Sequence, residues 1–332
     1  MDLQRIARVG VLALTGFLLG ASHAQQPSPT PRIGILMNGA AANNVAMEVV
    51  RTGFARLGYV EGKNAIFEPR YAEGRLDRLP GLAAELVGLN VDVIATFGGP
   101  ASSAAHRATK SIPIVFAIVA DPVAVGFVAS LDRPGGNATG ITNNDPQQAR
   151  LQLELLKSLS PGLTRVAILS DQDIPGADAS GLAPIERANV AAAKALGLES
   201  RLVKVRGPTP DFETAFKAMV DDGTEALLVL EVPVTLFHRK RIGELAAANR
   251  LPSMFSAGSS DAGGVLSFGT NVADTWPHVP LYVDRIIKGA KPGEMPVEVV
   301  TRREFVINLK AARELGVSVP AELQKRADRL ID

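Results

Sequence analysis

The segment Val91-Asp-Val-Ile-Ala-Thr96, followed by Phe97-Gly-Gly-Pro-Ala-Ser102, decides the fold class of this chain. Its first half is short and mostly apolar, as in a parallel strand that is buried on both faces. Its second half has glycines that free the backbone and a proline that suits a first helical turn. Together they predict a strand that passes directly into a helix, which is the repeating unit of an α/β sheet.

The same alternation extends along the chain in both directions. We expect strands at residues 33–37, 65–71, 91–96, 112–118, 166–170, 201–205, 226–230 and 252–255. Helical segments lie between them, as in Met47, Val50, Phe54 and Leu57, which share one helix face. A turn-rich break at residues 133–137 separates the strands into two series. The pattern therefore predicts an α/β protein of two lobes, each with a doubly wound parallel sheet.

The N-terminus has the features of a secretory signal peptide. Arg5 and Arg8 precede an apolar run over residues 9–20, and Ser22 and Ala24 occupy the small-residue positions before a cleavage site. The run is shorter than the roughly 20 residues that span a bilayer. We therefore expect a signal peptide at residues 1–24, a flexible leader at 25–31, and an exported mature chain without a membrane span.

Composition excludes several classes of function. Lys+Arg 35 against Asp+Glu 34 gives a formal charge of +1, so we expect no nucleic-acid partner and no attraction to an anionic membrane. The absence of cysteine excludes disulfides, thiolate metal sites, cysteine nucleophiles and a lipid anchor on cysteine. The four histidines have no metal-ligand spacing, and neither a G-x-S-x-G nor a G-x-G-x-x-G motif occurs. We expect no catalytic residues, no metal and no cofactor.

Candidate ligand-binding residues follow from the predicted topology. Ligands of open parallel sheets gather at the carboxyl ends of the strands, where loops lead into helices. Asn143 and Asn144 lie where the chain is expected to pass between the lobes. The complete candidate set is Asn38, Gly39, Gly98, Gly99, Pro100, Ala101, Ser102, Asp121, Asn143, Asn144, Asp171 and Glu231.

Two of these positions suggest opposite charges on the ligand. Backbone N–H groups at residues 98–102, with the Ser102 hydroxyl, favour a carboxylate, although a plain strand-to-helix turn has the same sequence. Glu231 suits an ammonium group, and a solvated acid at a strand end is its alternative. Asp121 and Asp171 equally fit a capping role, and Asp121 precedes Pro122 in a turn-like pair.

Several longer motifs resemble one bacterial family. They are Leu57-Gly-Tyr-Val-Glu-Gly-Lys-Asn64, Gly126-Phe-Val-Ala-Ser-Leu131, Arg133-Pro-Gly-Gly-Asn-Ala-Thr-Gly140 and Val306-Ile-Asn-Leu-Lys310. In this order they resemble the ABC-transporter substrate-binding proteins that include the tryptophan/tyrosine-binding TrpX-like proteins. The resemblance implies a type I periplasmic-binding-protein fold that closes on a small ligand, and an ABC permease with its ATPase as partners. It also makes an aromatic amino acid the leading ligand.

The resemblance further implies a three-segment hinge between the lobes. The expected crossings lie near residues 141–144, 256–260 and 295–297. They divide the chain into an N-terminal lobe (32–142 plus 258–296) and a C-terminal lobe (143–257 plus 297–332). Gly99, Pro100 and Ala101 match the loop that lines the cleft in relatives, whereas residues 231–233 depart from the family pattern.

The predicted function is capture of a small ligand in the periplasm by a monomeric substrate-binding protein without enzymatic activity. A ligand-sensing periplasmic module that presents its ligand to a membrane receptor would share this fold. A secreted hydrolase or transferase would need a polar catalytic cluster, which the sequence does not offer. The signal peptide disfavours a cytoplasmic repressor core.

Overall fold

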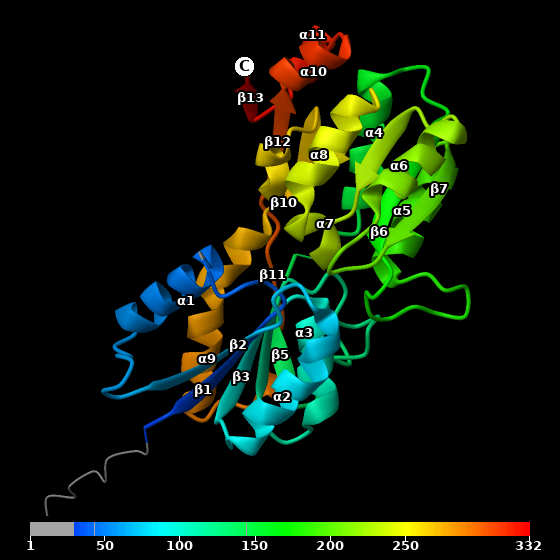
Figure 1. Ribbon diagram of the computed structural model, residues 1–332. Helices are drawn as coiled ribbons and strands as arrows, with labels where there is room; N and C mark the ends of the chain where they lie inside the picture. The colour runs from blue at the N-terminus through cyan, green and yellow to red at the C-terminus, as the bar shows by residue number, and fades with distance from the viewer. Residues whose placement is uncertain (1–29, 43, 144) are drawn as a thin grey trace, which may run out of the picture. The chain divides into compact units, whose positions relative to one another are not determined.

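The computed structural model describes residues 30–42, 44–143 and 145–332 (Figure 1). Residues Pro31–Asp332 form one compact unit. The predicted signal peptide and nearly all of the predicted leader therefore lie outside the described residues, as does Asn144.

The first sheet is entirely parallel among the described residues. Its order is β11 (Glu298–Val299), β5 (Ala138–Thr142), β4 (Ile114–Ala117), β3 (Val93–Phe97), β1 (Arg32–Met37) and β2 (Ile66–Tyr71). β3 lies in the middle with every residue buried, as the apolar reading of this segment predicts.

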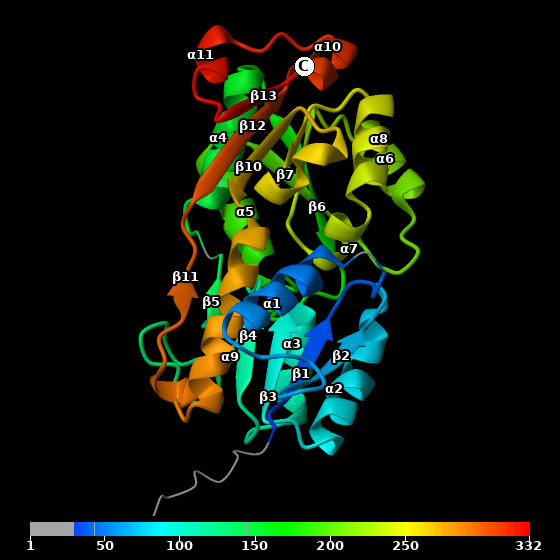
Figure 2. The same ribbon diagram turned by 90° about the vertical axis from the view of Figure 1, so that its left-hand side faces the viewer.

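Helices cover both faces of the first sheet. α1 (Val45–Arg56) packs beside α9 (Val279–Ile287) on one face, and α2 (Leu79–Gly88) beside α3 (Gly99–Ala108) on the other (Figure 2). Met47, Val50 and Phe54 point from α1 into the core, as their spacing predicts. Leu82 and Leu86 do the same from α2 on the opposite face.

The second sheet is larger and mixed. Its order is β13 (Arg329–Ile331), β12 (Arg303–Asn308), β10 (Leu266–Thr270), β9 (Ser253–Phe255), β8 (Ala226–Val229), β6 (Arg165–Asp171) and β7 (Glu199–Val205). β12 runs antiparallel to β10, while the other described pairs are parallel.

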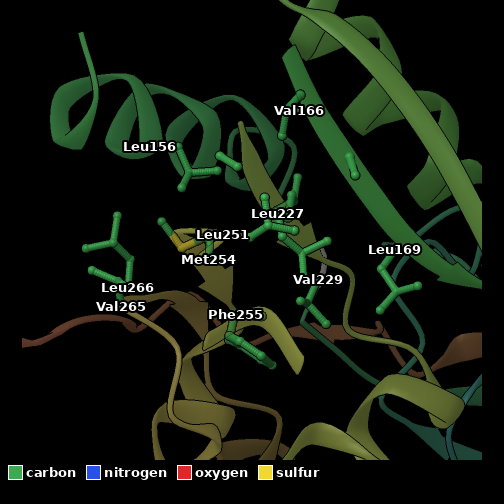
Figure 3. Close-up of a cluster of buried hydrophobic side chains, with 14 of the residues drawn as sticks. Leu156, Val166, Leu169, Leu227, Val229, Leu251, Met254, Phe255, Val265 and Leu266 are labelled. Carbon is green, nitrogen blue, oxygen red and sulfur yellow. The ribbon is translucent and has the colours of Figure 1, made fainter. Parts of the chain in front are cut away.

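The helices around the second sheet enclose a continuous apolar core. α4 (Gln148–Leu159) packs beside α5 (Pro184–Ala195), and α6 (Phe212–Asp221) beside α8 (Arg239–Ala248). Figure 3 shows Leu227, Val229 and Met254 from β8 and β9 in this core, with Leu156 of α4 on the side of Leu227 and Met254. The short α7 (Pro233–Phe237) precedes α8, and α10 (Leu309–Leu315) and α11 (Ala321–Gln324) complete the C-terminus.

The predicted fold class is confirmed, and each of the eight predicted strands lies within two residues of its expected position. β5, β10, β11, β12 and β13 were not expected. Gly140 interrupts the strand pattern of β5, because glycine weakens a strand interior. It is required there, since a Cβ at Gly140 would collide with the Phe116 carbonyl oxygen of β4.

Two of the expected crossings between the sheets need correction. The first passage follows Thr142 at the end of β5, at the expected place. The second follows Thr270 rather than residues 256–260, because β10 is still hydrogen bonded within the second sheet. The third follows Val299 rather than residues 295–297, because β11 pairs with β5 of the first sheet. Residues 258–270 therefore belong with the C-terminal lobe, and 297–299 with the N-terminal lobe.

Candidate functional site

A cavity of about 1010 Å³ lies at the carboxyl ends of both sheets. We call the lining residues that come directly after strands β1, β3 and β4, together with Trp276, the first wall. The lining residues that come after β6 and β8 form the second wall. Loops at these ends are where open α/β sheets bind ligands. The candidate residues that line the cavity are Asn38, Gly39, Gly98, Gly99, Pro100, Asp121, Asp171 and Glu231.

The turn after β3 presents backbone N–H groups on the first wall. Gly98 has a φ of 97°, and a Cβ at this position would collide with the Asn38 side-chain nitrogen, so only glycine fits. The first helical bond of α3 runs from Ser102 N to Gly98 O (3.0 Å). The N–H groups of Gly99 and Ala101 therefore have no acceptor within the helix. They form the donor end of a helix dipole, which favours an anion.

The side chains of Ala101 and Ser102 do not border the cavity, which corrects the sequence prediction. Ala101 is fully buried in the core between α3 and β3. The Ser102 hydroxyl donates to Gly98 O (2.9 Å) and bonds with the Thr96 hydroxyl (2.8 Å), and the residue is 1% exposed. Ser102 therefore stabilises the turn from its buried side. This matches the alternative in which residues 98–102 form a plain strand-to-helix turn.

Glu231 follows β8 on the second wall and has a carboxylate that is only half satisfied. Its Oε2 accepts a hydrogen bond from Asn143 Nδ2 (3.0 Å), whereas its buried Oε1 has no donor among the described residues. Burial raises the pKa of Glu231 to about 7, while the nearby polar side chains of Ser256 and Asn143 act in the opposite direction. A buried carboxylate without a matching cation is costly, which is why its neutral form is favoured.

Asn143 joins this carboxylate to the first passage between the sheets. The residue follows β5 directly and is 9% exposed, and it lies behind Glu231 rather than on the cavity lining. Its Oδ1 is also buried without a donor among the described residues. Two neighbouring side chains thus each have an acceptor oxygen without a donor. Asn144, the next candidate, is outside the described residues.

The two aspartates on the cavity lining differ in their hydrogen bonding. Asp171 is the last residue of β6 and is buried; its oxygens accept from the N–H groups of Asp173 (2.9 Å) and Val234 (3.2 Å). Burial raises the pKa of Asp171 despite these bonds. Asp121 accepts from Ala124 N (2.9 Å) and closes a local turn. Both carboxylates are therefore engaged with backbone, as the capping alternative predicts.

Most residues on the lining were not identified from the sequence; three of them are described here. Trp276 lies in the 3₁₀ helix η3 (Val272–His278), and its Nε1 is buried without an acceptor among the described residues. Ile118 follows β4 with a φ of 60°, and Phe237 ends α7 with 54% exposure. Trp276 is the one tryptophan of the chain, and this could have drawn attention to it as a candidate ligand contact. No sequence feature distinguishes Ile118 or Phe237.

The described residues also bear on a possible metal site. Within residues 30–42, 44–143 and 145–332, no three His, Cys, Asp or Glu side chains are grouped so that they could hold a metal ion.

The same described ranges contain no helix with the length and apolar character needed to cross a bilayer.

The two α/β lobes, with a cavity at the ends of their strands, have the type I periplasmic-binding-protein fold. The chain belongs to the ABC transporter substrate binding protein family, whose family model matches residues 37–331. The family that the sequence motifs suggested is thus confirmed.

Individual relatives agree with this assignment. A tyrosine-binding protein of Clostridioides difficile (strain R20291) is 24% identical over 285 residues, which cover 82% of this chain and 78% of the relative. A conserved domain protein from Vibrio cholerae O1 biovar El Tor strain N16961 has a TM-score of 0.80 and 25% identity, over 91% of this chain and 99% of that one. An ABC domain from Streptococcus pneumonia, solved in complex with L-Trp, has a TM-score of 0.79 and 23% identity, over 91% and 100%.

Proposed function

We propose that this chain is the substrate-binding protein of an ABC importer and that it captures a free α-amino acid, foremost an aromatic one. The observation that carries the proposal is the pair of buried acceptor oxygens, Glu231 Oε1 and Asn143 Oδ1, beside the cavity. An ammonium group has three N–H donors and one positive charge. It would pair with Glu231 and stabilise the ionised form of this carboxylate through charge-assisted hydrogen bonds.

The opposite wall offers a complementary site for the carboxylate. The free N–H groups of Gly99 and Ala101 open the helix α3, and Asn38 lies against the same turn. The first wall offers backbone donors for an anion beside Asn38 Oδ1, a buried acceptor without a donor among the described residues. The second wall offers acceptors for a cation, so the two walls together suit a zwitterion. A sugar would need paired donors and acceptors on both walls, and a simple carboxylic acid would leave Glu231 unpaired.

The aromatic preference rests on the relatives and on the lining. One relative is named for tyrosine and another was solved with L-Trp. Trp276, Phe237 and Ile118 add apolar surface to the cavity in this chain. An aromatic side chain buries a large area, which gives a small ligand much of its affinity. A micromolar dissociation constant requires only about 8 kcal/mol in total.

Closure of the two lobes would complete the site. The cavity volume of about 1010 Å³ lies at the upper end of the roughly 300–1,000 Å³ usual for small-molecule sites. Rotation about the three passages would bring the first wall, with Gly99, toward Glu231 on the second wall. The Asn143–Glu231 hydrogen bond lies at the start of the first passage, so a ligand bound to Glu231 would act next to the hinge.

Export and transport complete the proposal. The predicted signal peptide at residues 1–24 directs the chain to the periplasm, where the mature protein works as a monomer. It delivers its ligand to an ABC permease driven by a separate ATPase. No chemical step on the ligand is part of this function.

A thermal-shift screen tests the proposed function. The mature chain, residues 25–332, is unfolded and refolded to remove any bound ligand and is then screened against amino acids, carboxylates, purines and sugars. A ligand at about a hundred times its dissociation constant adds roughly 2.7 kcal/mol, which raises the melting temperature by a few degrees. We expect the largest shifts with L-tyrosine, L-tryptophan or L-phenylalanine. Shifts with sugars or purines and none with amino acids would contradict the proposal.

A further inference from the structure

Trp276 is held rigidly on the first wall. Its helix η3 begins just after the second passage, where Asn271 Oδ1 accepts from Ala273 N (3.0 Å). The Thr275 hydroxyl donates to Val272 O (2.6 Å) within the same turn. The indole packs partly against the core between the first sheet and α1, where Met37 and Met47 lie. The position of the ring is therefore fixed by the fold, not by a ligand.

The indole nitrogen of Trp276 lacks a hydrogen-bond partner. Nε1 is buried, and no described residue accepts from it. An indole N–H is a donor only, and buried donors in native proteins are almost always paired with protein, water or ligand. Trp276 lines the cavity, so a ligand that the first wall closes around can supply the missing acceptor.

Ile118 has an unusual backbone conformation on the same wall. It packs against the same apolar cluster as Trp276 and has a φ of 60°. Positive φ is a genuine outlier for a β-branched side chain. Strained backbone of this kind concentrates at active sites and ligand clamps, where the surrounding structure enforces it.

We propose that the Nε1–H of Trp276 donates a hydrogen bond to a carboxylate oxygen of the bound amino acid. This inference rests on the proposed function. The carboxylate is the matching group because the first wall also carries the N–H group of Gly99 at the start of α3, while Glu231 offers an acceptor on the second wall. Trp276 thereby makes the site select ligands with a free carboxylate.

The unmodified protein provides the first test, because Trp276 is its one tryptophan. Tryptophan emission, excited selectively, is recorded during titration of the refolded mature chain with L-tyrosine. We expect a saturable change in emission with the same dissociation constant that calorimetry gives. Calorimetric binding without any change in the emission would overturn the proposed contact.

The second test combines a substitution with a change of ligand. Trp276→Phe keeps an aromatic ring and removes the N–H, and tyramine is L-tyrosine without its carboxylate. We expect Trp276→Phe to weaken L-tyrosine binding about tenfold or more and tyramine binding less than twofold. Leu281→Ala, an exposed position on the adjacent helix α9, serves as the matched control and leaves both affinities unchanged.

The outcomes separate this inference from the proposed function. Equal weakening of both ligands by Trp276→Phe would mean that the ring contributes packing alone, and the inference would be wrong. Unchanged binding of both ligands would overturn it as well. In either case L-tyrosine binding by the unmodified protein would leave the proposed function in place. If the unmodified protein bound no amino acid, the proposed function itself would fail and the inference with it.

Discussion

The two walls of the cavity recognise charge by different means. The first wall presents donors that belong to the backbone, at Gly99 and Ala101, and depends on the unusual backbone of Gly98. The second wall presents acceptors that belong to side chains, above all the carboxylate of Glu231. A backbone site is fixed by the fold and hardly changes with pH, whereas a side-chain site can be removed by one substitution and titrates. Substitutions should therefore affect the two walls differently.

The largest effect is expected from Glu231→Gln. The substitution keeps the shape and a hydrogen bond to Asn143 but removes the charge that faces the ligand. Losing one partner of a desolvated charge pair costs about 3 kcal/mol or more, so we expect a hundredfold or greater loss of L-tyrosine affinity in calorimetry. Glu322→Gln, at an exposed carboxylate, is the control. Unchanged affinity in Glu231→Gln would remove Glu231 from the site.

The second prediction concerns pH and has opposite signs for stability and for binding. The pKa of Glu231 is raised from 4.5 to about 7. At a pH between these two values, Glu231 is therefore protonated in the folded state and ionised in the unfolded state. The free energy of unfolding should therefore fall as the pH rises from 4.5 to 7, by about 3 kcal/mol at most. Affinity for an ammonium ligand should rise over the same range, because Glu231 becomes ionised.

Urea unfolding and calorimetry between these pH values measure both trends. Asp171 contributes in the same direction, since burial also raises its pKa. The comparison is therefore made between the unmodified chain and Glu231→Gln, in which the Glu231 contribution is absent. Identical pH profiles for the two proteins would contradict the raised pKa of Glu231.

Gly98→Ala tests the backbone site of the first wall. Gly98 has a φ of 97°, and a Cβ there would collide with Asn38. Gly62 has a φ of 76° but open space around it, so Gly62→Ala measures the cost of the backbone conformation alone, about 1 kcal/mol. We expect Gly98→Ala to lose about 2 kcal/mol in urea unfolding and to weaken L-tyrosine, whereas Gly62→Ala leaves affinity unchanged. Equal effects of the two substitutions would show that the Asn38 contact is unimportant.

The smallest effect on binding is expected from Ser102→Ala. The hydroxyl supports the turn from behind through Gly98 O and Thr96, and it does not border the cavity. Removing it should cost about 1 kcal/mol of stability and change the affinity less than threefold. A tenfold loss of affinity with full stability would restore the direct ligand contact that the sequence suggested.

Most of the fold and about half of the site could be predicted from the sequence, for identifiable reasons. Alternating strands and helices indicate where the carboxyl ends of the strands lie, and this rule finds Asn38, Gly98, Asp171 and Glu231. It cannot tell which way a side chain points. Ser102 has the right position and the right chemistry, but the backbone of Gly98 turns its hydroxyl inward.

The remaining features depend on contacts between segments that are far apart in the chain. Asn143 and Glu231 are 88 residues apart and meet only because the first passage runs beside the end of β8. Trp276 reaches the first wall because the chain returns to the first sheet after Thr270. The return expected near residue 258 also put Trp276 in the N-terminal lobe, but no sequence rule pointed its indole toward the cavity.

The zwitterion model is tested most directly by calorimetric titration of the refolded mature chain with three matched ligands: L-tyrosine, tyramine, which lacks the carboxylate, and the deaminated acid, which lacks the ammonium. We predict micromolar binding of L-tyrosine, with at least tenfold weaker binding of tyramine and at least a hundredfold weaker binding of the deaminated acid. Equal binding of L-tyrosine and the deaminated acid would contradict the role of Glu231 and Asn143, and with it recognition of an amino acid.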